Sequence, residues 1–120
     1  MGTTEYLHYD QIVDHLTVYR SDEKIISNLD LGLAIISFNA KKQIMGVEFV
    51  GAHTNFKIPL DVLKNINSCA IDVRYVPSQK TVIISAVFHY QKQESPLVWS
   101  HAGVDLGVSP ITEHFSCSIA

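Results

Sequence analysis

Histidine is the first residue type to consider for chemistry, because it binds metal ions and changes charge near neutral pH. The sequence contains six histidines, and none stands in an HxxxH, HxH or HExxH spacing. His8 and His15 lie on two expected strands joined by a short turn, so they could face each other as a metal-binding or pH-sensitive pair. Asp14 lies on the face opposite to His15 and cannot complete that set. We expect two polar side chains on a solvated face, with no bound metal and no cofactor.

Acidic residues are the second group of candidates, and four of them lie near turns or strand ends. Paired carboxylates perform acid–base chemistry only where their surroundings push their pKa values apart. Asp10 and Asp30 lie at expected turns, where hydrogen bonds from the nearby backbone explain them. Asp14 and Glu48 are the other two, and Glu48 lies on the wetter face of its strand. We expect structural roles for all four.

A nucleophilic site would need Ser or Cys beside a histidine and an orienting acid. The one local grouping is Ser116, Cys117 and Ser118 near His114, close to an end of the sequence that we expect to fray. The chain contains no GxSxG elbow and no phosphate-cradling GxxxxGK[ST] or GxGxxG loop. We therefore predict no catalytic residues, and a protein that is not an enzyme.

Aromatic and sulfur-containing residues give two weaker signals. Trp99, Tyr90 and Phe88 would form a patch for a base or a sugar, although core packing is the commoner role of such residues. Cys69 and Cys117 have no CxxC spacing and so give no zinc signature. We expect these two cysteines to be reduced thiols with no relation to each other.

Length and composition place the chain among small globular domains. Its 120 residues, 47% hydrophobic and 18% charged, suffice for one domain over residues 1–120 with its own core. The net charge of −3 argues against general nucleic-acid binding, since Lys41 and Lys42 form only a doublet on a turn. The polar start is unlike a signal peptide, and the apolar runs are of strand length, so no membrane association is expected. We therefore expect an intracellular, cytoplasmic protein.

The residues between Gly32 and Gly51 predict the central β-hairpin. Leu33 to Phe38 is a short apolar run between turn formers, which is typical of a buried strand. In the partner strand, from Ile44 to Val50, alternation places Met45, Val47 and Phe49 on the core face and Ile44, Gly46 and Glu48 on the wetter face. Asn39 is expected to cap the connecting turn, and Gly46 predicts a bulge or a close neighbour.

Alternating residues predict further strands on either side of this hairpin. Residues 5–9 and 14–20 form an N-terminal hairpin, and 25–29 form a weak short strand. The one helix is expected over 59–66, with Pro59 at its first position and Leu60, Leu63 and Ile66 sharing a stripe. Strands follow at 70–75 and at 81–89, the second placed centrally because both its faces are largely apolar. We expect a polar loop over 91–96, a strand at 97–99 and a last strand near 115–119.

These elements predict an α+β domain that is mostly β, with an antiparallel twisted sheet of hairpins and one short helix. Two sequence blocks recur in order, since 71–84 resembles 6–18 and Val104-Asp105-Leu106-Gly107-Val108 resembles Leu29 to Leu33. Such matches suggest a duplicated unit with halves 1–66 and 67–120. The alternative is the chance likeness of alternating strands.

The first half of the chain resembles a known family. Tyr9-Asp10, the strand 14–18, Leu31-Gly32-Leu33, Phe38-Asn39 and Ile44-Met45-Gly46-Val47-Glu48 resemble the small "domain of unknown function 2283" family over residues 6–51. Because that family has no established activity, the resemblance implies a fold of strands and turns and no site.

The expected function follows from the physics of exposed strands. Hairpin sheets leave edge strands whose unpaired backbone is usually paired or covered in native proteins. We therefore expect a non-enzymatic domain that acts through protein contact, most simply as a homodimer. The alternative is a small-molecule or metal-binding protein that uses the His8 and His15 face or the Trp99 region.

Overall fold

The computed structural model describes residues 4–21, 24–107 and 109–118, which form two antiparallel sheets and one short α-helix. The strands of the first sheet are β1 (Thr4–Asp10), β2 (His15–Ser21), β3 (Ser27–Asp30), β4 (Ala34–Phe38) and β5 (Ile44–Val50). Helix α1 (Leu60–Lys64) then leads to β6 (Ser68–Val76), the 3₁₀ turn η1 (Pro77–Gln79), β7 (Thr81–Tyr90), β8 (Gln93–Ala102) and β9 (Ile111–Ser118).

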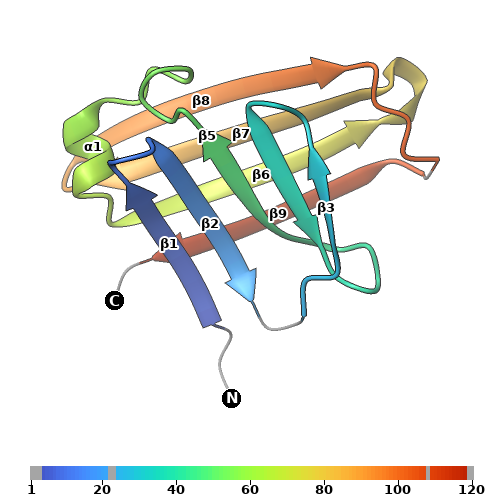
Figure 1. The fold of residues 1–120 in the computed structure, drawn as a ribbon, viewed down its shortest axis with the longest axis horizontal. Helices are drawn as coiled ribbons and strands as arrows, with labels where there is room; N and C mark the ends of the chain where they lie inside the picture. The colour runs from blue at the N-terminus through green and yellow to red at the C-terminus, as the bar shows by residue number, and fades with distance from the viewer. Residues whose placement is uncertain (1–3, 22–23, 108, 119–120) are drawn as a thin grey trace.

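The two sheets lie face to face, and their strands run across one another (Figure 1). The first sheet has the order β1-β2-β5-β4-β3 and the second the order β8-β7-β6-β9. Every neighbouring pair of strands is antiparallel. The predicted class, mostly β with antiparallel sheets and one short helix, is confirmed.

The central hairpin forms between β4 and β5, with one change of register. Ser37 lies opposite Gly46 but Phe38 lies opposite Ile44, so a bulge leaves Met45 without a partner. This extra residue reverses the alternation beyond it, and Ile44 joins the core at 2% exposure. The expectation that Ile44 lies on the wetter face is therefore wrong. Asn39 caps the turn as predicted, because its side-chain oxygen accepts hydrogen bonds from the N–H groups of Lys41 and Gln43, both at 2.9 Å.

Most strand ends differ from the predictions by one or two residues, and three elements differ in ways that need explanation. The expected polar loop over 91–96 is wrong, because β8 begins at Gln93 and pairs with β7 along its whole length. Polar side chains and Pro96 fit there because β8 is an edge strand with a solvated face. The last strand begins at Ile111 rather than near 115, and residue 119 lies outside the described residues. The helix begins one residue late, with Pro59 at its N-cap, and Leu60 is exposed while Val62 and Leu63 are buried.

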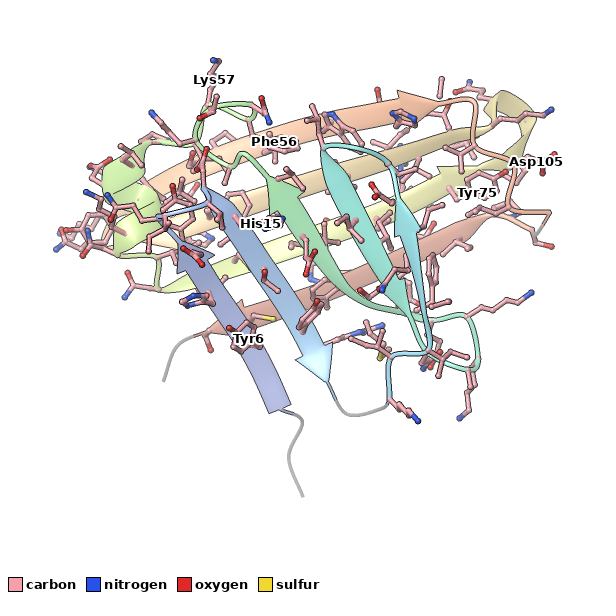
Figure 2. The ribbon with its side chains drawn as sticks, in the orientation of Figure 1. Tyr6, His15, Phe56, Lys57, Tyr75 and Asp105 are labelled. Carbon is pink, nitrogen blue, oxygen red and sulfur yellow. The ribbon has the colours of Figure 1, made fainter. Side chains whose placement is uncertain are left out.

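The core fills the space between the sheets. Phe49 of β5 meets Phe88 of β7 edge to face at 5.7 Å between ring centroids, and both rings are fully buried. Phe56, on the loop before α1, packs against Phe49 at 5.3 Å and against Trp99 of β8 at 6.0 Å (Figure 2). One aromatic chain therefore joins both sheets and the loop. Phe88 is fully buried and Trp99 is partly buried against the core, so both contribute to core packing.

Polar contacts tie the sheets together where β9 passes under β1 and β2 (Figure 1). The Arg20 guanidinium forms an ion pair with Glu113 at 2.7 Å and donates to the Ile44 carbonyl at 3.1 Å. The same guanidinium lies 5.5 Å from the centre of the Phe115 ring, as a cation–π contact requires. These contacts fix β9 against the first sheet.

The structure does not confirm the internal duplication. In the first sheet the meander β3-β4-β5 is joined by an earlier strand, β2, whereas in the second the meander β6-β7-β8 is joined by a later strand, β9. The echoed Asp-Leu-Gly segments instead share a local turn. Asp30 accepts a hydrogen bond from the Gly32 N–H at 2.8 Å, and Asp105 accepts one from the Gly107 N–H at 3.0 Å. Val108, the last residue of the echo, lies outside the described residues.

Asp14 holds the β1–β2 turn against the loop that follows β5. Its carboxylate accepts hydrogen bonds from the Tyr9 hydroxyl at 2.6 Å and from the His53 and Thr54 N–H groups, both at 2.9 Å. Desolvation acts to raise the pKa of Asp14, but these hydrogen bonds outweigh it and hold the pKa well below its usual range. The pKa of Tyr9 is raised to about 12, mainly by burial and further by the hydrogen bond to Asp14 and the charge of Asp14.

Replacing Asp14 by Asn tests this clamp, because Asn adopts the left-handed conformation of Asp14 (φ 56°) readily but carries no charge. We expect Asp14→Asn to lower the free energy of unfolding at neutral pH by about 1–3 kcal/mol, measured by urea denaturation. A carboxylate whose pKa is lowered by folding stabilises fully above its unfolded pKa, near 4, and loses that contribution as pH falls toward the folded pKa. The difference between wild type and variant should therefore shrink below about pH 4.

Asp105→Asn is the matched control, since the Asp105 carboxylate accepts a single backbone N–H within its own turn. It should cost less than Asp14→Asn. A difference between wild type and Asp14→Asn that stays constant from neutral to acidic pH would contradict the proposed role of the charge.

Candidate functional site

The outward face of the second sheet leaves apolar side chains without a covering layer among the described elements. We call it the β6–β8 face and define it by Ala70, Asp72, Arg74, Ile83, Ser85, Val87, Glu94, Pro96 and Val98. The other face of β7, with Val82, Ile84, Ala86 and Phe88, is buried against the first sheet. On the β6–β8 face, Ile83 and Val87 are only half-buried, and Val98 is 74% exposed. The prediction that β7 is internal to a sheet is confirmed, but no described element covers its second apolar face.

On the β6–β8 face, the middle of β7 and β8 is uncharged, Asp72 of β6 lies beside Ser85, and further charges lie toward the ends. Strand register places Ala70 beside Val87 and Val87 beside Pro96, while Ser85 lies beside Val98. Arg74 lies toward one end, and Glu94 lies at the other, 4.0 Å from the His89 ring. A sheet face with this pattern can approach another flat surface closely at its centre, with ion pairing at its ends.

Asp72 and His114 form the one carboxylate–imidazole pair at hydrogen-bond distance that we find among the described residues, with 2.8 Å between Oδ1 and Nδ1. Both side chains are at least half exposed, so the pair lies on the surface at the β6 edge of the β6–β8 face. Cys117 points to the opposite side of β9 and is buried, whereas Ser116 shares the face of His114. The predicted grouping of His114 with Cys117 is therefore absent.

A different polar network covers the outward face of the first sheet. The Tyr19 ring lies over Gly46, and its hydroxyl donates to Glu48 at 3.0 Å. Burial is the main cause that raises the pKa of Tyr19, and the hydrogen bond to Glu48 and the charge of Glu48 raise it further. Tyr6 stacks on the Tyr19 ring at 6.1 Å between centroids. Gly46 thus has the close neighbour that its position predicted, and Glu48 serves to orient that tyrosine.

His8 and His15 do not lie directly opposite each other, as the alternative of a facing histidine pair would require. His8 lies opposite Thr17, and His15 lies opposite Asp10, so the two rings occupy diagonal positions on one face. The His15 Nε2 atom is buried, and we find no hydrogen-bond partner for it within the described part of the chain. No group of three or more metal-ligating side chains occurs within the described ranges 4–21, 24–107 and 109–118.

The remaining acidic candidates have local roles. Asp10 accepts a hydrogen bond from the Ile12 N–H at 3.0 Å, which is the predicted turn interaction, and Asp30 does the same for Gly32. In the hydrogen bonds that we find among the described residues, neither Asp10 nor Asp30 is paired with a second carboxylate, as acid–base chemistry would require.

The two cysteines lie together, which overturns the expectation that they are unrelated. Cys69 on β6 is directly opposite Cys117 on β9, and both are buried. The Cys117 thiol donates to the Tyr19 carbonyl oxygen at 3.2 Å. Sequence spacing gave no sign of this arrangement, because it depends on which strands pair and in which register.

A cavity of about 260 Å³ opens at the corner where β3 and the start of β9 diverge. Leu29, Phe38, Leu106 and Ile111 form its apolar lining, and Lys42 is the one charged residue among the described lining residues. The Tyr75 hydroxyl accepts from the Leu106 N–H at 3.1 Å and donates to the Val104 carbonyl at 2.9 Å, which fixes this wall near Asp105 (Figure 2). No sequence motif marked this cavity, because its walls come from separate elements.

Comparisons with known proteins return no matching family model, no matching curated protein and no matching solved structure. The resemblance to the "domain of unknown function 2283" family therefore stays a prediction. None of the helices within the described residues is long and apolar enough to cross a membrane.

Substituting Gly46 by Ala tests the packing of Tyr19 on the first sheet. A methyl group at this position would overlap the Tyr19 ring and approach the Val18 carbonyl oxygen to 2.7 Å. We expect Gly46→Ala to lower the free energy of unfolding by about 1–3 kcal/mol, measured by urea denaturation. Because Tyr19→Ser removes the ring, Gly46→Ala should cost less in that background. Equal costs in both backgrounds would show that the ring does not require Gly46.

Proposed function

We propose that this protein is a non-enzymatic, intracellular domain that acts through protein contact and forms a homodimer through its β6–β8 face. The observation that carries this proposal is the uncovered apolar face of β7. A strand with apolar residues on both faces is typically covered on both sides. In the monomer Ile83 and Val87 remain partly exposed beside Val98, and a partner surface would bury all three.

A second copy of the chain is the occupant that this face favours. Ala70 and Ser85 have small side chains that allow two sheets to approach closely, and Asp72, beside Ser85, keeps its charge paired with His114 of the same protomer. A twofold axis across the strands would bring the Arg74 end of one protomer over the Glu94 end of its partner, so opposite charges would meet. This arrangement of charges supports a self-complementary contact between two copies of the sheet.

Val98→Lys tests the dimer, because Val98 is 74% exposed in the monomer and its replacement should not disturb the fold. We expect wild type to sediment as a dimer at micromolar concentration. Val98→Lys should weaken dimerisation by at least about tenfold, since two like charges would be buried together at the interface. Analytical ultracentrifugation over a concentration series measures both.

Val13→Lys is the matched control, as it places the same substitution at a 59% exposed valine in the β1–β2 turn. It should leave dimerisation unchanged. A wild-type protein that remains monomeric at about 100 μM would overturn the homodimer. A dimer that Val98→Lys leaves intact would overturn the assignment to the β6–β8 face.

A small-molecule role is the second candidate, and the cavity beside β3 favours it. Its volume of about 260 Å³ exceeds the roughly 150 Å³ that holds benzene in an engineered cavity. Apolar walls with Lys42 in the lining suit a small apolar molecule that carries a carboxylate.

Octanoate, an apolar chain with a carboxylate, is a suitable probe of this cavity. Its binding can be measured by NMR from the changes in amide chemical shifts. We expect shifts at Leu29, Phe38 and Ile111, and about tenfold weaker binding in Lys42→Gln, because the ion pair would be lost. Lys41→Gln, at the neighbouring lysine outside the cavity lining, should bind like wild type. Equal binding by all three proteins would exclude recognition of the carboxylate by Lys42.

A further inference from the structure

The two cysteines of this chain form a cross-strand pair in the second sheet. The sequence has only these two cysteines, far apart along the chain, and the pairing of β6 with β9 places them in register. They flank the buried pair formed by Ile71 and Phe115, and both point toward the interior. This juxtaposition is a property of the fold alone and does not depend on the proposed dimer.

The backbone geometry of such a pair suits a disulfide bond. Directly opposite residues of antiparallel strands have Cα atoms about 4.5 or 5.5 Å apart, depending on the hydrogen-bonding position. A disulfide accepts Cα separations of about 4.4–6.8 Å. Cys69 and Cys117 could therefore be joined with small side-chain adjustments and without a change of register.

Burial controls how a reagent reaches these thiols. Cys69 is 2% exposed and Cys117 is 1% exposed, so an oxidant needs a local opening. β9 is an edge strand, and Cys117 is the residue before its last one, Ser118. Strand ends at sheet edges open at much lower free energy than internal strands, so Cys117 becomes accessible before Cys69 on the internal strand β6.

We propose that Cys69 and Cys117 are a reversible modification site, which a low-molecular-weight disulfide converts to an intramolecular disulfide. The Cys117 thiolate attacks one sulfur of the oxidant, whose S–S bond breaks and releases one thiolate. The resulting mixed disulfide is attacked at the Cys117 sulfur by the Cys69 thiolate, which releases the second. The protein loses two electrons and two protons, and the oxidant becomes two thiols.

The new bond would fasten the edge strand β9 to the internal strand β6. Cys117 also contacts the first sheet through the Tyr19 carbonyl oxygen, so the bond lies at a junction between the two sheets. Closing a long loop restricts the unfolded chain, and the oxidised form should therefore be the more stable one.

Glutathione disulfide is the probe that tests this site in the full-length native protein. Intact mass after incubation should show the loss of two hydrogens with no retained glutathione, and peptide mapping should identify the Cys69–Cys117 bond. Dithiothreitol should restore both thiols. The oxidised protein should unfold at a temperature higher by about 5 °C or more.

Single substitutions separate the two steps. Cys69→Ser and Cys69→Ala should both stop at one retained glutathione on Cys117, and the alanine variant keeps the test valid if serine disturbs the core. Cys117→Ser should react more slowly, because Cys69 lies on the internal strand. A native wild-type protein that keeps two thiols, gains two glutathiones or forms disulfide-linked dimers would overturn the proposal.

Discussion

The edge-to-face contact between Phe49 and Phe88 is the interaction on which the two-layer architecture depends. It places a ring of the first sheet against a ring of the second at the centre of the core, and Phe56 and Trp99 extend the contact to the loop before α1 and to β8. The two crossing sheets share none of the described strands, so side chains must set their relative position. The Arg20–Glu113 pair fixes the same relation at the edge where β9 passes beneath β2.

Much of the fold could be predicted from alternation, because side chains on a strand point to opposite sides at each step. The strands β2, β6 and β7 were located correctly on that basis, apart from a residue or two at their ends. Gly46 predicted a bulge or a close neighbour, but alternation alone could not show that Met45 is the unpaired residue, which moves Ile44 into the core. The polar start of β8 was missed because an edge strand is held by backbone pairing and its exposed side chains need not be apolar.

The candidate sites were harder to predict than the strands, because they depend on contacts between distant segments. The meeting of Cys69 and Cys117 requires the β6–β9 register, and the cavity by Leu29 requires two sheets to diverge. The turn roles of Asp10 and Asp30 were predictable because their hydrogen-bond partners lie two residues away. Contacts between residues close together in the sequence could therefore be predicted, whereas contacts between distant segments could not.

The outward faces of the two sheets differ in how their residues are satisfied. On the first sheet, the Tyr19 ring covers Gly46 and its hydroxyl is bonded to Glu48, so that surface already has an ordered polar covering. On the second sheet, Val87 and Val98 have no comparable cover among the described residues. The same architecture thus presents one face suited to water and one suited to a further layer.

The placement of β9 has a consequence for the order in which this protein can be completed during synthesis. β6, β7 and β8 form a local meander, but β6 obtains its second neighbour only from residues 111–118. Until those residues leave the ribosome, the edge of β6 and the underside of β2 stay open, with Arg20 lacking Glu113. Residues 111–118 thus complete both the second sheet and its ion-paired contact with β2.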